Sequence, residues 1–353
     1  MIYISILGAL IPPAFISIFS KRKFILSSLF MTLVMTFVVG FRYQTGTDYN
    51  EYLNIWMYSP SINDPAFFTT YTHIEPGFKL LIELCKAISA EPYLFFFINS
   101  CLCFSLLWGG LYRLSKRYKF NVCLSLFIYC CLFLIPYPMN AMRQALVMSL
   151  FLFTIQDIVD RKLVRVLLIS LIGYGIHSTS IFILLMYFLF NYRGGYKNIF
   201  ICTLSLSLFL LMYNPLTYIV EIISPGKYAL FKDTWGGGEF YNALGRFTTY
   251  IILSYISFKS KNANASLSLM KFMMVSYSLG FVLYFAFFDA SMLATRINMF
   301  FRLLEILIVP IALTGFNIKS RMIIVFLILA VTLPYYYVAS INPQNQYNTF
   351  LHY

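Results

Sequence analysis

Apolar segments of about 20 residues recur along the whole 353-residue chain, and short basic clusters separate many of them. A helix needs about 20 mostly apolar residues to cross the hydrocarbon layer of a bilayer. Only 11% of the residues are charged, whereas average soluble domains have roughly 25%. The pattern predicts a single all-α, polytopic integral-membrane domain over residues 1–353, with about 11–12 transmembrane helices.

The basic residues give the chain a net charge of +13, but they form small clusters between apolar segments. Such clusters are typical of loops that stay on the cytoplasmic side of a membrane, and they argue against nucleic-acid binding. The first apolar segment, Met1–Ser20, lacks a basic leader and precedes Lys21-Arg22-Lys23. We therefore expect it to remain as a first span with its N-terminus outside.

Placing the basic clusters inside predicts two larger external loops, at about 41–91 and 214–245. Pro76–Ser89, in the first loop, reads as an interfacial helix because its charges would make full burial costly. The stretch between Arg165 and Arg193 is too short for two full crossings. It is either a pair of short embedded helices with His177 at their tip or one long span. We prefer the pair, because Gly173 and Gly175 would permit a break.

Polar chemistry is concentrated on the predicted external side. Of the thirteen acidic residues, only Asp157, Asp160 and Glu305 fall elsewhere. The external ends of separate spans carry a recurring set of polar groups, namely Arg42, Asp48, Glu75, Arg143, Gln144, His177, Arg246 and Arg296. Ionisable groups at membrane depth are costly, so their presence favours a functional site.

Arginine suits a diphosphate because its planar fork can hold two oxygens and stays charged when partly buried. Asp48, Glu75 or His177 could take a proton from an attacking hydroxyl, and the sequence leaves the choice among them open. Recognised metal-binding motifs are absent, so we expect neither a metal nor another cofactor. Arg302 and Glu305 lie three apart on one predicted helix, and we interpret them as a structural ion pair.

Several motifs occur in a recognisable order: Phe41-Arg42-Tyr43-Gln44-Thr45-Gly46-Thr47-Asp48-Tyr49, Glu75-Pro76-Gly77-Phe78, Asn140-Ala141-Met142-Arg143-Gln144, His177-Ser178-Thr179-Ser180 and Arg296. In order and spacing they resemble the EpsG/Wzy-like family of O-antigen and exopolysaccharide polymerases, over about residues 24–316 and more weakly to Tyr347. The chain departs from that pattern at Thr179, where a small apolar residue commonly follows the serine.

The resemblance implies a GT-C-like glycosyltransferase in the bacterial inner membrane. It would join undecaprenyl-diphosphate-linked oligosaccharide repeat units at the periplasmic face. Asp48, Glu75 and His177 would then be catalytic, and the substrate diphosphate or glycan would be bound by Arg42, Arg143, Gln144 and Arg296. Arg246 has no clear motif match, and its assignment to substrate binding rests on the topology alone.

The partners implied are the lipid-linked glycan donor and acceptor, membrane lipid, and a chain-length regulator protein. Two other functions remain open from the sequence. A flippase for the same lipid-linked oligosaccharide should carry charges along the depth of a central cavity, whereas most of the acidic residues and the isolated arginines here gather at one face. A membrane O-acetyltransferase of glycans would also place histidine and arginine near a membrane surface.

Overall fold

The chain folds almost entirely into helices. The computed structural model describes residues 2–19, 25–190, 196–213, 215–226, 229, 240–260 and 264–350. Several residues named above lie outside those ranges, namely Met1, Ser20, Lys21, Arg22, Lys23 and Arg193, and so does much of the loop predicted at 214–245. The described chain divides into two compact units, with unit 1 formed by Met1–Tyr187 and Val325–Tyr353 and unit 2 by Phe188–Ile324.

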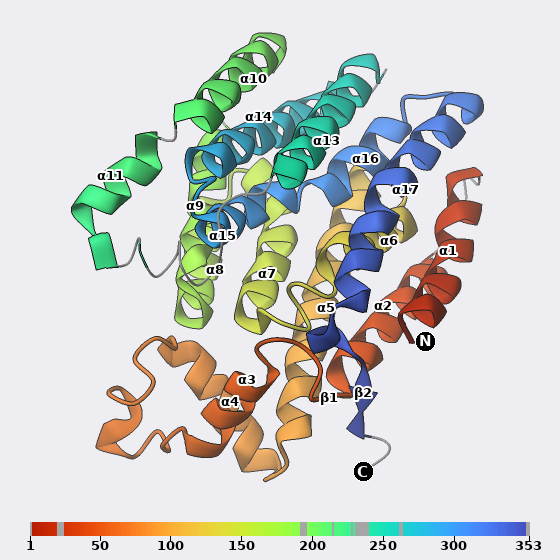
Figure 1. Cartoon of the computed structure of the whole chain (residues 1–353). Coiled ribbons are helices and arrows are strands. Elements are labelled where there is room, and N and C mark those ends of the chain that lie inside the picture. Colours follow the sequence, from red (N-terminus) through yellow and green to blue (C-terminus); the bar gives the residue numbers. More distant parts are fainter. Residues whose placement is uncertain are drawn as a thin grey trace. The chain divides into compact units, whose positions relative to one another are not determined.

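Unit 1 holds the first eight helices of the chain, most of the ninth, and the later part of the last helix (Figure 1). Its helices are α1 (Ile2–Phe19), α2 (Ile25–Gly40), α3 (Tyr49–Tyr58), α4 (Pro76–Ile88), α5 (Pro92–Tyr118), α6 (Val122–Phe133), α7 (Met142–Val159), α8 (Leu163–Ile176), most of α9 (Ile181–Leu189) and the later part of α17 (Ile318–Ile341). Three 3₁₀ turns join them: η1 (Pro65–Phe67), η2 (Ser178–Ser180) and η3 (Pro343–Asn345). Helix α5 packs against both α2 and α7.

Four of the described helices are long and apolar enough to cross a membrane, namely Pro92–Tyr118, Met142–Val159, Leu267–Ala286 and Ile318–Ile341. Six shorter helices, α1, α2, α6, α8, η2 with α9, and α10, are also apolar. These findings confirm a helical membrane protein. The count of 11–12 spans, the GT-C-like arrangement and the external loops remain predictions.

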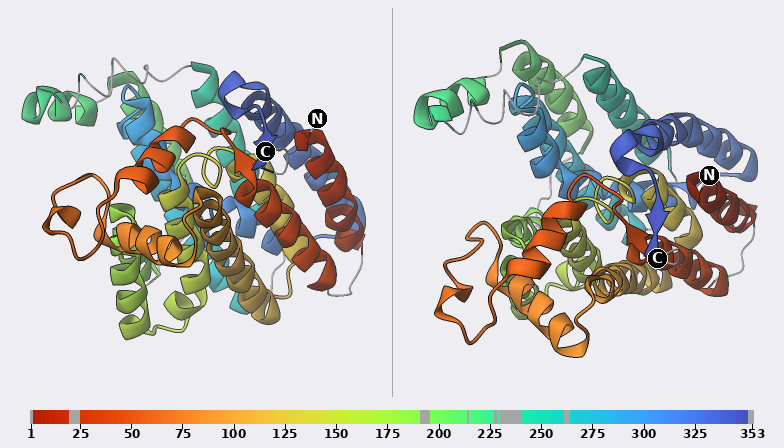
Figure 2. Two further views of the ribbon diagram at one scale, coloured as in Figure 1. Left: turned by 90° about the horizontal axis from the view of Figure 1, so that it is seen from below. Right: turned by 60° about the horizontal axis from the view of Figure 1, so that its bottom comes forward.

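The first predicted external loop is an ordered subdomain that contains α3, η1 and α4. Figure 2 shows α3 and α4 beside one another, in orange. Apolar side chains from both helices and from the start of α5 form one buried cluster, which includes Tyr49, Tyr52, Trp56, Phe78 and Phe95. The helix predicted at Pro76–Ser89 is confirmed as α4. Helix α3 was not predicted, because its ten residues have no long apolar run.

Lys79 lies on the buried side of α4, although its charge had predicted an exposed position. Its side chain is 3% exposed, and its ammonium group donates to the backbone oxygens of Phe67 and Thr70 at 2.9 and 2.6 Å. Buried charges persist where hydrogen bonds replace lost water. Lys79 therefore ties the loop around η1 to α4 instead of marking a face of α4 that contacts solvent.

The opposite end of unit 1 carries a cluster of ion pairs around Asp157, near the C-terminal end of α7. The Asp157 side chain is 3% exposed and lies 3.3 Å from Arg113, 3.8 Å from Lys162 and 3.6 Å from Arg165. These residues come from the end of α5 and the start of α8. A buried carboxylate among three basic groups is well compensated. This end corresponds to the predicted cytoplasmic side.

The prediction of two short helices around His177 is confirmed, since α8 ends at Ile176 and α9 begins at Ile181 after the η2 turn. The break was predicted at Gly173 and Gly175, and this was wrong, because both glycines lie within α8 and the helix breaks at His177. A Cβ on Gly173 would meet the Ser180 Cβ at 2.8 Å. Gly173 therefore lets the turn fold back closely onto α8.

Unit 2 contains α10 (Tyr196–Tyr213), α11 (Pro215–Ile223), α13 (Phe240–Lys259), α14 (Asn264–Ala286), α15 (Ser291–Arg302) and α16 (Glu305–Leu313). Helix α14 contacts all the others of this set. The predicted pairing of Arg302 with Glu305 is confirmed at 3.3 Å, at the junction of α15 and α16. The Tyr277 hydroxyl of α14 also donates to Glu305, at 2.8 Å.

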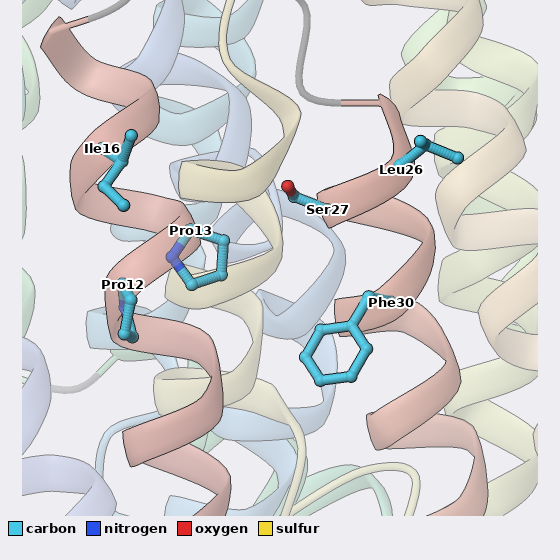
Figure 3. Close-up of a pocket in the computed structure, with 6 residues that line it drawn as sticks. All are labelled: Pro12, Pro13, Ile16, Leu26, Ser27 and Phe30. Atoms are coloured by element: carbon cyan, nitrogen blue, oxygen red, sulfur yellow. The ribbon is translucent and has the colours of Figure 1, made fainter.

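An apolar groove lies between α1 and α2, with a volume of about 400 Å³ (Figure 3). It is lined by Pro12, Pro13, Ile16, Leu26, Ser27 and Phe30. Its lining carries no charged side chain, so it does not resemble a site for a diphosphate or a sugar.

Candidate functional site

The segment after α2 forms a tight loop that docks onto two distant parts of unit 1. Strand β1 (Arg42–Tyr43) pairs antiparallel with β2 (Asn348–Thr349), which comes from the C-terminal segment. The Gly46 backbone has φ +107, a conformation that glycine adopts without steric cost. A Cβ at Gly46 would also collide with the Met139 carbonyl oxygen. The Gly-containing motif therefore reflects both backbone conformation and close packing.

Asn140 fixes the position of Asp48 through Thr47. The Asn140 Oδ1 atom accepts the Thr47 backbone N–H at 2.5 Å, and the Thr47 hydroxyl donates to Asp48 Oδ1 at 2.8 Å. Asp48 is half-buried and directly precedes α3. Its carboxylate is thus held at the edge of the loop, where α3 begins.

Arg42 lies beneath this loop instead of lining an open surface. Its side chain is 0% exposed, and its guanidinium lies over the rings of Phe96 and Tyr49, at 5.0 and 5.9 Å. Nη1 donates to the Val39 oxygen at 2.6 Å, while Nε and Nη2 have no hydrogen-bond partner. Burial lowers the pKa of Arg42 to about 10, which still leaves it charged at neutral pH.

Glu75 and Arg143 form the central ion pair of the site. Arg143, in the first turn of α7, donates through Nη1 to Glu75 Oε2 at 2.5 Å and to the His73 backbone oxygen at 3.2 Å. The other carboxylate oxygen, Oε1, accepts the Ser178 backbone N–H at 2.9 Å. Glu75 thereby joins the start of α4 to the start of α7 and to the η2 turn.

Tyr52 connects this ion pair with the loop that carries Asp48. Burial raises the pKa of the Tyr52 phenol, the nearby Arg143 guanidinium lowers it, and the Asp48 carboxylate raises it. The two charged groups act on one buried hydroxyl, so both lie in its neighbourhood. Tyr52 therefore lies near both Arg143 and Asp48.

His177 directly precedes Ser178 in the chain, at the break between α8 and η2. Its Nε2 atom is 3.5 Å from the Gln144 amide nitrogen, and its Nδ1 atom is 2.8 Å from the Thr179 hydroxyl. The Gln144 side chain is 4% exposed, directly after Arg143 on α7. Four predicted site residues thus form two contacting pairs, Glu75 with Arg143 and Gln144 with His177, and the Ser178 backbone N–H links the pairs through Glu75.

Close approach of α4 and α8 at two glycines makes this arrangement possible. A Cβ on Gly77 would lie 2.7 Å from the Gly175 oxygen and 2.9 Å from its carbonyl carbon. Glu75 directly precedes α4 and Gly175 is near the end of α8. The glycine contact therefore sets the distance across which Glu75 reaches Ser178.

We expect Gly77→Ala to separate α4 from α8, because the new methyl group meets backbone atoms that cannot rotate away. Overpacking of this kind costs about 1–3 kcal/mol, and the Glu75 contact with Ser178 should be lost with it. Thermal unfolding of the purified protein and its activity would report the two effects. Gly8→Ala is the matched control, since nothing lies within 4 Å of a Cβ there. Equal behaviour of the two variants would contradict the proposed role of Gly77.

Arg246 and Arg296 belong to unit 2. The Arg246 guanidinium of α13 lies 4.8 Å from the centre of the Tyr284 ring, and Arg296 is exposed on α15. The contacts that join the other predicted residues all lie in unit 1. A role for these two arginines in substrate binding remains a prediction.

The structure adds residues that sequence reasoning did not select. Asn140 was noted only as part of a motif, and Thr179 only as a departure from one. The C-terminal segment also supports the site loop: the Gly46 N–H donates to Gln344 at 2.9 Å, and the Tyr347 hydroxyl donates to Val38 at 2.9 Å. The polar, turn-forming sequence after α17 gave no signal of which distant segment it would contact.

Among the described residues, no three His, Cys, Asp or Glu side chains gather as metal ligands. The expectation of metal-independent chemistry stays a prediction.

Comparison with known proteins gives one match to a family model, described as the EpsG family, over residues 25–353. The match covers nearly the whole chain, including every predicted site residue. Neither the curated proteins nor the solved structures contain a match.

Proposed function

Because the chain belongs to the EpsG family, whose members are polysaccharide-polymerase-like membrane proteins, we propose that it is an O-antigen-type polysaccharide polymerase. It joins undecaprenyl-diphosphate-linked oligosaccharide repeat units at the periplasmic face of the bacterial inner membrane. The observation that carries this proposal is the cluster at one end of unit 1, in which Arg143 contacts Glu75, Gln144 contacts His177, and Ser178 links the two pairs through its N–H to Glu75. That end lies opposite the basic cluster around Asp157.

The reaction proposed is a transfer of the growing glycan onto a new repeat unit. The non-reducing-end hydroxyl of the incoming unit attacks the anomeric carbon of the growing glycan. A glycosidic C–O bond forms, the C–O bond to the lipid diphosphate breaks, and the hydroxyl proton passes to a protein group. Holding two lipid-tethered substrates in one place supplies much of the rate enhancement.

Arg143 is suited to the diphosphate that leaves. Its side chain is 14% exposed and its charge is fixed in direction by Glu75 and the His73 oxygen. A positioned cation stabilises the negative charge that develops on a departing oxygen without having to reorganise. Its Nε atom is buried without a hydrogen-bond partner, so its donors are not all used within the protein.

Arg42 has a different local role in this proposal. It is fully buried under Phe96 and Tyr49, and therefore supports the loop that carries Asp48 while adding positive potential to the site. Arg246 and Arg296 are proposed to contact the glycan or the second diphosphate. No metal or other cofactor is required, because the diphosphate linkage already provides an activated leaving group.

The fate of lipid-linked repeat units tests the proposal. A strain without this protein should accumulate single lipid-linked repeats on the outer face of the inner membrane, and the wild-type gene should restore long polymer. Repeats retained on the inner face would indicate a flippase instead. Normal polymer that lacks acetyl groups would indicate an O-acetyltransferase. Either of these results would overturn the assignment.

A further inference from the structure

The surroundings of His177 determine which of its two ring nitrogens carries the proton. The Thr179 backbone N–H points at Nδ1, with a nitrogen-to-nitrogen distance of 3.2 Å. The Thr179 hydroxyl lies 2.8 Å from the same atom, and the Gln144 amide lies 3.5 Å from Nε2. A hydroxyl can rotate and an amide can turn over, so each can serve as donor or acceptor.

The backbone N–H differs from those two groups because it can only donate. It therefore requires a lone pair on Nδ1, and the neutral ring must carry its proton on Nε2. The contact is also the N-terminal cap of the η2 turn, since His177 precedes Ser178–Ser180. The contact that caps this turn therefore also sets the tautomer of the His177 ring.

From this geometry we propose that His177 serves the reaction as a hydrogen-bond donor through Nε2, and that a carboxylate takes the proton from the attacking hydroxyl. The inference rests on the proposed polymerase function. In this tautomer Nε2 has no lone pair, and the lone pair of Nδ1 is already used by the turn. Asp48 or Glu75 is then the proton acceptor.

An N–H donor at this position lies close to the groups proposed to bind the diphosphate. Ser178, the neighbour of His177, donates its N–H to Glu75, which in turn holds Arg143. Gln144, the neighbour of Arg143, approaches the Nε2 side of the ring. The Nε2–H group therefore lies in the same cluster as Arg143. There it can stabilise a developing negative oxygen of the departing diphosphate.

Thr179 contributes a second, adaptable partner for Nδ1. Its hydroxyl donates to Nδ1 of the neutral ring beside the backbone N–H. If Nδ1 becomes protonated, the hydroxyl can accept from it, although the backbone N–H contact is lost. Thr179 is also the residue at which the chain departs from the motif of the EpsG/Wzy-like family. Thr179 is accordingly a positioning residue for His177, and its backbone N–H, which any residue except proline retains, sets the tautomer.

Nitrogen NMR of the full-length protein in lipid nanodiscs tests the tautomer directly. The chain has three histidines, so labelling with ¹⁵N-histidine gives few signals, and His73→Gln and His352→Gln remove the other two for assignment. At a pH where the ring is neutral, we expect a protonated Nε2 and an unprotonated Nδ1. Thr179→Val should leave this tautomer unchanged. A proton on Nδ1, in the wild type or in Thr179→Val, would overturn the inference.

The catalytic role is tested by comparing His177→Gln with His177→Ala. Both changes remove the ring that caps η2, so the difference between them reports the donor. A glutamine amide N–H can reach the region of Nε2, and one hydrogen bond to a charged group is worth about 10-fold or more in rate. His177→Gln should therefore have a kcat at least about 10-fold above that of His177→Ala.

Equal loss of kcat in the two variants, with both proteins folded, would contradict the donor role. Failure of the polymerase proposal would look different: the wild-type protein would make no polymer, while the NMR signals could still show the expected tautomer. The spectroscopic and kinetic results therefore separate the two proposals.

Discussion

Replacing Arg143 with alanine should lower the rate of glycan extension by about 100-fold or more, the usual effect of removing one positioned charge from a transition state. Cells that carry this variant should display glycans of a single repeat unit. The change removes the cation that Glu75 holds in place at 2.5 Å, and it leaves the Ser178 N–H contact of Glu75 intact. Electrophoresis of the extracted surface polysaccharide would show the loss of the ladder.

Two control variants make this result specific. Arg143→Lys keeps the charge but loses the planar fork, so it should retain intermediate activity. Arg117→Ala removes an arginine that pairs with Asp160 at the opposite end of unit 1, and it should leave polymer length unchanged. Long polymer made by a folded, normally abundant Arg143→Ala protein would remove Arg143 from the site.

The second large effect is expected in unit 2, where Glu305→Leu should destabilise the protein by about 3–5 kcal/mol. Arg302 and Glu305 have side chains that are 9% and 4% exposed. Loss of the carboxylate leaves a buried cation without its partner, and this is the costly way to break such a pair. Thermal unfolding in detergent would measure the effect.

A triple variant shows whether the pair has only a structural role. Tyr277→Phe, Arg302→Met and Glu305→Leu together remove the hydroxyl donor, the cation and the anion that contact one another. Apolar groups of similar size can replace a buried pair without loss of stability. The triple variant should regain most of the wild-type stability and retain polymer formation. A well-folded triple variant without polymer would instead assign these residues to function.

The sequence was a good guide to the membrane class and to the polar cluster. Apolar runs and basic clusters depend on local composition, and Glu75, Arg143, Gln144 and His177 were selected because each lies at an external helix end. The structure brings these four together as two contacting pairs, which the Ser178 N–H links through Glu75. Asp48 lies outside these contacts and is held instead by the Thr47 hydroxyl.

What the sequence did not indicate are features that depend on contacts between distant segments. Gly77 and Gly175 are unremarkable separately, and their meaning appears only when α4 and α8 meet. Arg42 was predicted as a ligand group because arginine favours diphosphates, yet its position under Phe96 follows from the pairing of β1 with β2. Thr179 has a role only because the η2 turn folds its N–H toward His177.

Reconstitution of the purified protein in liposomes with a synthetic lipid-linked repeat unit tests the central claim most directly. The reaction should need neither a nucleotide sugar nor a metal, and it should give a ladder of products that differ by one repeat unit, while Arg143→Ala should give none. Movement of the lipid-linked unit across the bilayer without any ladder, or a ladder of equal intensity from Arg143→Ala, would contradict the account.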